Sequence, residues 1–169
     1  MARSLSLRRL SRAFAWSLAV SLALGMAAAD ARSDDFARGL QAYDGGDYGT
    51  AMAAWRRAAV AGNTDAMTAI ANAYQQGQGV QAKLGAAVSW YRRAANGGNA
   101  SAQMNLGDLA SRGEGVPRDP VEAYFWLGLA AAQGNRWAAE RQAQVASDLN
   151  PDKIARAEAR IRDFEPADP

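Results

Sequence analysis

One phrase of 13 residues occurs three times in this chain at a constant spacing. The copies read AMAAWRRAAVAGN, AVSWYRRAANGGN and AYFWLGLAAAQGN, and they end at Asn63, Asn99 and Asn135. Both intervals are therefore 36 residues long. A fixed period of roughly 20–50 residues is typical of solenoids, in which small units stack because none can bury its apolar face alone. The period predicts a repeat architecture.

The positions that the two longest copies share follow the period of a helix. In the unit of residues 64–99, the apolar positions of a first helix are Ala66, Ile70, Ala71 and Tyr74, and those of a second helix are Ala87, Trp90 or Tyr91, Ala94 and Ala95. These spacings of three, four and seven residues place each set on one helical face, and they do not alternate as in a strand. Small residues allow two backbones to approach closely, while the aromatic rings fill the space beside them. The sequence predicts an all-α fold of antiparallel helix pairs.

Within each of the two units a loop joins the two helices, and these loops match: QGQGV in the first and RGEGV in the second. The complete pattern resembles the SEL-one-like repeat (SLR) family, which is related to the tetratricopeptide repeat. The positions that carry the resemblance are Ala66, Ile70, Ala71, Tyr74, Gly77, Gly79, Val80, Ala87, Trp90, Ala94, Ala95, Gly98 and Asn99, and their counterparts 36 residues later include Gly107 and Asp119, with Ala110 for the tyrosine. The copy at 34–63 has a tight GGDY turn and looks like an ordinary tetratricopeptide hairpin. The resemblance implies a short right-handed α-solenoid.

The first 29 residues have the anatomy of a secretory signal peptide. Four arginines of the basic start precede an apolar stretch from Ala13 to Ala29, and small residues there fit cleavage near Ala29 or Ala31. We expect an exported chain, periplasmic or in the cell envelope of a bacterium. Cleavage after Ala29 leaves 15 basic residues against 17 acidic ones, which removes the electrostatic support for nucleic-acid binding. An uncleaved signal anchor is the alternative.

The chain contains neither cysteine nor histidine, which limits the kinds of catalytic and metal site that it can form. Disulfides, the common zinc sites and the nucleophilic sites that need a histidine base are excluded. We therefore predict no catalytic residue, no cofactor and no metal site. An enzyme on this scaffold would need a serine–lysine pair or two carboxylates, and Lys83 and Lys153 stand near no serine in a recognisable motif.

The sequence divides into three parts after the signal peptide. A repeat domain is expected over residues 34–149, with units at about 34–63, 64–99 and 100–135. A capping helix follows at 150–164, with Asn150 as its N-cap and Pro151 as its first residue. Asp119 is expected to cap the helix that begins at Pro120, with Glu122 completing a capping box. Residues 165–169 are expected to fray.

The binding surface implied by the resemblance is the concave face, which the first helix of each unit lines. Its outward positions differ between the two long units, whereas the core positions persist. Variation of this kind fits a specialised surface and ordinary solvent exposure equally well. The predicted protein-binding residues are Thr68, Asn72, Gln75, Gln76, Met104, Asp108 and Arg112.

These observations favour a non-catalytic exported scaffold that binds a protein or peptide partner and neither nucleic acid nor, after signal cleavage, a membrane. Two alternatives remain at this point. One is a small hydrolase or wall-acting enzyme of the cell envelope built on the same helices. The other is a membrane-tethered adaptor that keeps its signal segment.

Overall fold

The computed structural model describes residues 34–167, and the predicted signal peptide lies outside these residues. The described part contains helices, turns and loops and no strand, which confirms the predicted fold class. A helical segment covers residues 34–44. It is followed by α2 (Tyr48–Val60), α3 (Thr64–Gln76), α4 (Leu84–Asn96), α5 (Ala100–Arg112), α6 (Pro120–Ala132), α7 (Arg136–Ala146) and α8 (Pro151–Arg162).

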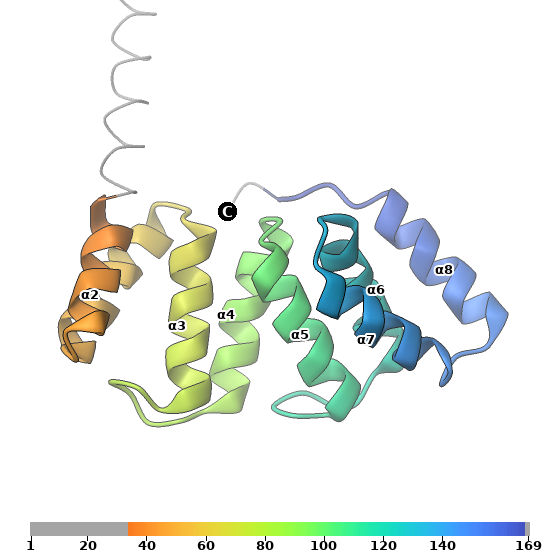
Figure 1. Cartoon of the computed structure of the whole chain (residues 1–169), viewed down its shortest axis with the longest axis horizontal. Coiled ribbons are helices and arrows are strands. Elements are labelled where there is room, and N and C mark those ends of the chain that lie inside the picture. Colours follow the sequence, from red (N-terminus) through yellow and green to blue (C-terminus); the bar gives the residue numbers. More distant parts are fainter. Residues whose placement is uncertain (1–33, 168–169) are drawn as a thin grey trace, which may run out of the picture.

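The helices succeed one another along the long axis of the molecule as antiparallel pairs (Figure 1). The first helices are the segment 34–44, α3, α5 and α7, and the second helices are α2, α4 and α6. The core between them is built from fully buried alanines and a few large side chains, among them Trp55, Tyr91, Leu106 and Leu127. The small residues let neighbouring helices approach, and the large ones fill the remaining volume.

A glycine–asparagine turn joins each pair to the next and explains the ends of the repeated phrase. Gly62, Gly98 and Gly134 have φ angles of 88°, 86° and 90°, a region that residues with a Cβ avoid. The following asparagines begin α3, α5 and α7. The side chains of Asn63, Asn99 and Asn135 accept hydrogen bonds from the backbone N–H of Ala66, Ala102 and Ala138. These bonds satisfy amides that the first turn of a helix leaves unpaired.

The loops inside the two long units rest on the preceding unit. Gly79 has a φ of 70°, and an added Cβ would lie 2.5 Å from the Cβ of Tyr48, the first residue of α2. Gly115 has a φ of 69°, and its Cβ would lie 2.8 Å from the carbonyl carbon of Leu84, the first residue of α4. Each loop therefore contacts the start of the second helix before it, which links successive pairs on the side opposite the glycine–asparagine turns.

Asp119 caps α6 as the sequence predicts, but the capping box is incomplete. The Asp119 side chain accepts hydrogen bonds from the backbone N–H groups of Val121 and Glu122. The Glu122 carboxylate does not turn back to the cap and instead forms an ion pair with Arg160 of α8 at 2.7 Å. The attraction of the guanidinium on the neighbouring helix has replaced the local bond.

The final helix leaves the pattern of the repeats and packs mainly against α6 rather than against α7. Asn150 caps α8 through the backbone N–H of Lys153. The Arg160 guanidinium lies 4.2 Å from the centre of the Phe125 ring, and Phe164 meets the rings of Phe125 and Trp126 edge to face. The arrangement covers the outer side of α6 with α8 and Phe164.

The residues after α8, for which the sequence predicts fraying, lie against an earlier part of the stack over 165–167. After α8 the chain runs back toward α4 (Figure 1), where the backbone N–H of Ala167 donates to the carbonyl of Asn96 at 2.8 Å. Pro166 lies against Gly98 of the turn between α4 and α5. The aromatic packing of Phe164 anchors the start of this segment, and a sequence pattern gives no sign of such a long-range contact.

The contact between Gly115 and Leu84 predicts a large effect of a small substitution. Gly115→Ala should lower the free energy of unfolding by about 2 kcal/mol or more, since it adds backbone strain at a positive φ and a clash with main-chain atoms. Gly134→Ala is the matched control, because its φ is also positive but no atom lies within 4 Å of the added Cβ. It should cost about 1 kcal/mol. Urea titrations would compare the two, and equal losses would contradict the proposed contact.

Candidate protein-binding surface

The face formed by the first helices carries two hollows. The N-terminal hollow has a volume of about 160 Å³ and is lined by Leu40, Tyr43, Trp55, Ala69, Asn72, Ala73 and Gln76. The C-terminal hollow has a volume of about 290 Å³ and is lined by Asp108, Arg112, Trp137, Glu140, Arg141 and Gln144. The first is largely apolar with amide groups at its edge, whereas the second is a charged network with one indole ring.

Asp108 of α5 is the centre of the C-terminal hollow. Its carboxylate accepts from the Arg112 guanidinium at 2.8 Å, within the same helix, and from Arg141 of α7 at 3.2 Å. Arg141 also donates to Gln144 and to the hydroxyl of Ser111, both at 2.9 Å. Bonds between ionised groups are stronger than neutral ones, and together these contacts fix the two arginines in place.

Trp137 provides the apolar part of the C-terminal hollow. It lies in the first turn of α7 and is 46% exposed, which is unusual for so large an apolar side chain. Nearly half of this large side chain is therefore open to solvent. The structure ends its series of first helices with α7, and no further unit covers the ring within the described residues.

The N-terminal hollow has an exposed apolar rim and a buried aromatic floor. Leu40 is 41% exposed at its edge. The Trp55 side chain is buried, and its Nε1 has no hydrogen-bond partner within residues 34–167. A Cβ on Gly39 would lie 2.3 Å from this nitrogen, so only glycine allows the helical segment 34–44 to approach the ring. Tyr43 closes the side of the hollow and donates its hydroxyl hydrogen bond to Gln78.

Tyr91 of α4 forms hydrogen bonds with two of the predicted binding residues from the core side. Its ring is fully buried, and its hydroxyl meets the side-chain oxygens of Asn72 and Gln75 on α3. The single hydroxyl proton can be donated to one of these oxygens at a time. Burial raises the pKa of Tyr91 above its ordinary value of 10.0. Asn72 and Gln75 are half-buried, and they contact the core through Tyr91 as well as facing the surface.

The predicted binding residues do not form one surface. Asn72 and Gln76 reach the N-terminal hollow, and Asp108 and Arg112 reach the C-terminal one. Thr68 contradicts the prediction, because it is only 7% exposed and donates to the carbonyl of Thr64. An inner helix is covered by neighbours on several sides, so its buried arc is wider than one stripe.

The other two predicted residues lie outside both hollows. Gln75 faces Tyr91, and the Met104 sulfur accepts a hydrogen bond from the Asn135 side chain. Sequence reasoning missed Trp137 and Arg141 of α7. A signal existed for Trp137, since the positions 36 and 72 residues earlier hold Ser101 and Asp65, both polar and exposed.

Other kinds of site find little support in the described part of the chain. Within residues 34–167, no three His, Cys, Asp or Glu side chains gather as they would around a metal ion. None of the helices in this range is both long enough and apolar enough to cross a membrane.

The geometry defines a helical-repeat protein with a hollowed first-helix face, and comparison with known families identifies the repeat. The Sel1 repeat matches residues 64–99 and 100–135. The chain therefore contains two Sel1 repeats, and the resemblance to the SEL-one-like family is confirmed. Sel1 repeats commonly form scaffolds for protein–protein interaction and are generally non-catalytic.

Solved structures give the same result. A protective antigen of uropathogenic Escherichia coli strains, which displays an SLR fold, is 27% identical over 79% of this chain with a TM-score of 0.73. A Sel1 repeat protein from Oxalobacter formigenes is 34% identical over 68% of this chain with a TM-score of 0.63. The matched parts are 29% and 34% of those two chains, respectively. No curated protein matches the sequence.

The contacts of Tyr91 predict how stability depends on pH. Tyr91→Phe should lower the free energy of unfolding by about 1 kcal/mol at neutral pH, because it removes a hydrogen bond to the α3 amides. Above pH 10 the unfolded chain releases the phenolic proton, whereas burial keeps it bound in the folded chain. The stability of the unsubstituted protein should thus fall more steeply with rising pH than that of the variant. Urea titrations at pH 7 and pH 11 test this, and parallel pH profiles would contradict it.

Proposed function

We propose that this chain is an exported, non-catalytic scaffold that binds a segment of a partner polypeptide along its first-helix face, the concave face expected for such a stack. The observation that carries the proposal is the exposed ring of Trp137 beside the fixed arginines of the C-terminal hollow. Tryptophan and arginine are enriched among the residues that dominate binding energy at protein interfaces.

The C-terminal hollow suits an uncharged or mixed segment better than a strongly charged one. Its arginines, Arg112 and Arg141, are both bonded to Asp108, and Arg112 also lies 3.3 Å from Glu114. Glu140 adds a further negative group to the lining. A partner segment would place an apolar or aromatic side chain on Trp137 and its peptide groups against the polar rim.

The N-terminal hollow gives the same face a second contact. Leu40 offers exposed apolar surface there, and Asn72 and Gln76 bring amide groups that can bond to a peptide backbone. A segment lying across α3 and α5 would reach both hollows. Binding at two weak sites on one partner raises the overall affinity, because the second contact forms within the complex.

The proposed surface is tested by site-specific photo-crosslinking in cells. A photoreactive phenylalanine placed at Trp137 or at Gln76 should capture the same partner protein. The same residue placed at Val60 is the control, because that position is 87% exposed but lies in neither hollow. Equal capture at all three positions, or capture only at Val60, would refute binding along the first-helix face.

Export is supported by the basic start, the apolar stretch and the small residues near Ala29 and Ala31. N-terminal sequencing of the chain isolated from the cell envelope should yield a mature form that begins just after one of these alanines. An intact N-terminus on membrane-bound material would instead favour the tethered adaptor.

A further inference from the structure

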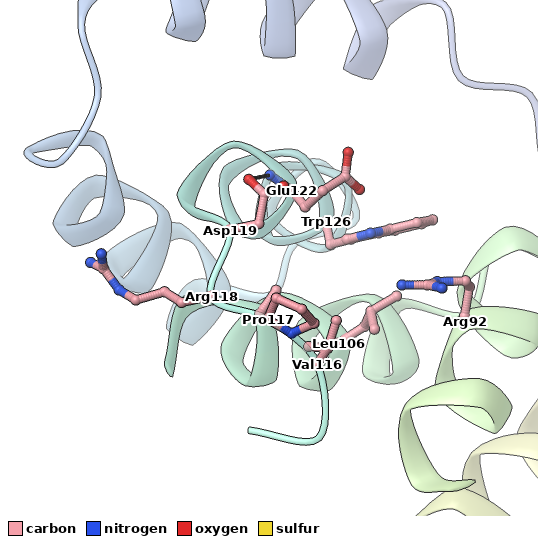
Figure 2. A pocket seen from close by; sticks show the side chains of 9 residues that line it. Arg92, Leu106, Val116, Pro117, Arg118, Asp119, Glu122 and Trp126 are labelled. Atoms are coloured by element: carbon pink, nitrogen blue, oxygen red, sulfur yellow. Dashed lines mark hydrogen bonds between the residues drawn. The ribbon is translucent and has the colours of Figure 1, made fainter. Parts of the chain in front are cut away.

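A third pocket lies between α4, α5, α6 and the loop before α6 (Figure 2). It has a volume of about 240 Å³ and shares no residue with the two hollows of the first-helix face. We call it the inter-helix pocket; it is lined by Arg92, Leu106, Ala110, Val116, Pro117, Arg118, Asp119, Glu122 and Trp126. Its inner wall is apolar, since Leu106, Ala110 and Trp126 are 1%, 4% and 6% exposed.

The repeat period identifies the counterpart of this pocket one unit earlier. The positions 36 residues before Ala110 and the loop 116–119 are Tyr74 and the loop 80–83, and these same residues line a separate hollow. The two pockets are therefore the same place in successive repeats. Of these matched positions, the valine (Val80 and Val116) is shared and the others differ, among them the tyrosine, which is alanine in the later unit.

Tyr74 shows what occupies part of this place in the earlier unit, where a hollow of about 630 Å³ remains beside its ring. Its ring packs against the main core next to Val80, and its hydroxyl lies 3.5 Å from the guanidinium of Arg56, which donates to it. The counterpart of Arg56 in the later unit is Arg92 of α4. The valine of the loop (Val80 and Val116), the tryptophan of the second helix (Trp90 and Trp126) and the arginine are thus retained, while the inter-helix pocket has no counterpart of the phenol ring.

Among Arg92, Arg118 and Glu122, only Arg92 is directed toward the opening of the pocket. In Figure 2 the Arg92 side chain reaches toward Trp126 and Leu106, whereas Arg118 and Glu122 point away. Arg118 pairs with Asp148, and Glu122 pairs with Arg160. Within residues 34–167 the Arg92 guanidinium has no hydrogen bond or ion pair, so its donors are available to a ligand.

We propose that the inter-helix pocket binds the phenol ring of a tyrosine on a partner polypeptide, in the place that the tyrosine of the repeat would occupy. The ring packs against Leu106, Val116 and Trp126, and Arg92 donates a hydrogen bond to the phenol oxygen as Arg56 does to Tyr74. Aromatic rings gain from such edge and face contacts beyond the area that they bury. The site is independent of the first-helix face and adds a second contact surface to the scaffold.

The experiment uses N-acetyl-tyrosine amide as the probe and follows the indole resonances of the full chain by NMR. Because one side chain buries little area, a dissociation constant in the millimolar range is expected, at about 1 mM or weaker. The signal of Trp126 should shift on titration. N-acetyl-phenylalanine amide, which lacks the hydroxyl, should bind several-fold more weakly, and Arg92→Ala should remove this difference.

Two reciprocal substitutions directly test whether a tyrosine ring fits the inter-helix pocket as Tyr74 fits the earlier unit. Ala110→Tyr supplies the ring from within and should abolish probe binding while keeping or raising the melting temperature. Tyr74→Ala should open the earlier place and add a second site, seen as a new shift at Trp90. If Ala110→Tyr does not fold, Tyr74→Ala and Arg92→Ala still decide the question.

Three results would overturn the proposal. The first is unchanged probe binding in Ala110→Tyr, which would place the probe elsewhere. The second is no shift at Trp126 in the unsubstituted chain up to the solubility limit of the probe. The third is binding of p-cresol without binding of N-acetyl-tyrosine amide or of the tripeptide Gly-Tyr-Gly, which would indicate a site for a free small phenol instead of a polypeptide side chain.

Discussion

The fold depends on one repeated contact at the start of α3, α5 and α7, where an asparagine side chain accepts a hydrogen bond from the backbone N–H three residues further on. It is made by Asn63, Asn99 and Asn135, and each follows a glycine with a positive φ. The glycine reverses the chain in a minimum of residues, and the asparagine fixes where the next helix begins. The same turn at a constant spacing makes the helix pairs stack in register.

Most of the fold could be predicted from the sequence because it rests on local chemistry. The alanines, the turn glycines and the capping residues Asp119 and Asn150 each need only their near neighbours, and the structure places them as expected. Contacts between distant elements could not be predicted. The bond from Ala167 to Asn96 and the ion pair of Glu122 with Arg160 depend on where α8 lies, which no periodicity encodes.

The candidate site was harder to predict, for a related reason. A variable position on a first helix can face solvent, a neighbouring helix or the helix behind it. Thr68 proved buried, and Asn72 and Gln75 turned to Tyr91, whose counterpart in the next unit is Leu127. Since leucine offers no hydrogen bond, Asp108 and Ser111 of that unit bond instead to Arg141 of α7. The repeats therefore share a frame and differ in their polar contacts, and the differences create the hollows.

The most direct test of the account is the affinity of the chain for the partner captured from the first-helix face. It would be measured for the unsubstituted chain and for a variant with Arg112, Glu140, Gln144 and Trp137 all changed to alanine. These four side chains line the C-terminal hollow and contribute little to the core. The account predicts a folded variant with a melting temperature within a few degrees of the original and at least a 100-fold loss of affinity, or roughly 2.7 kcal/mol. An unchanged affinity in the folded variant would contradict it.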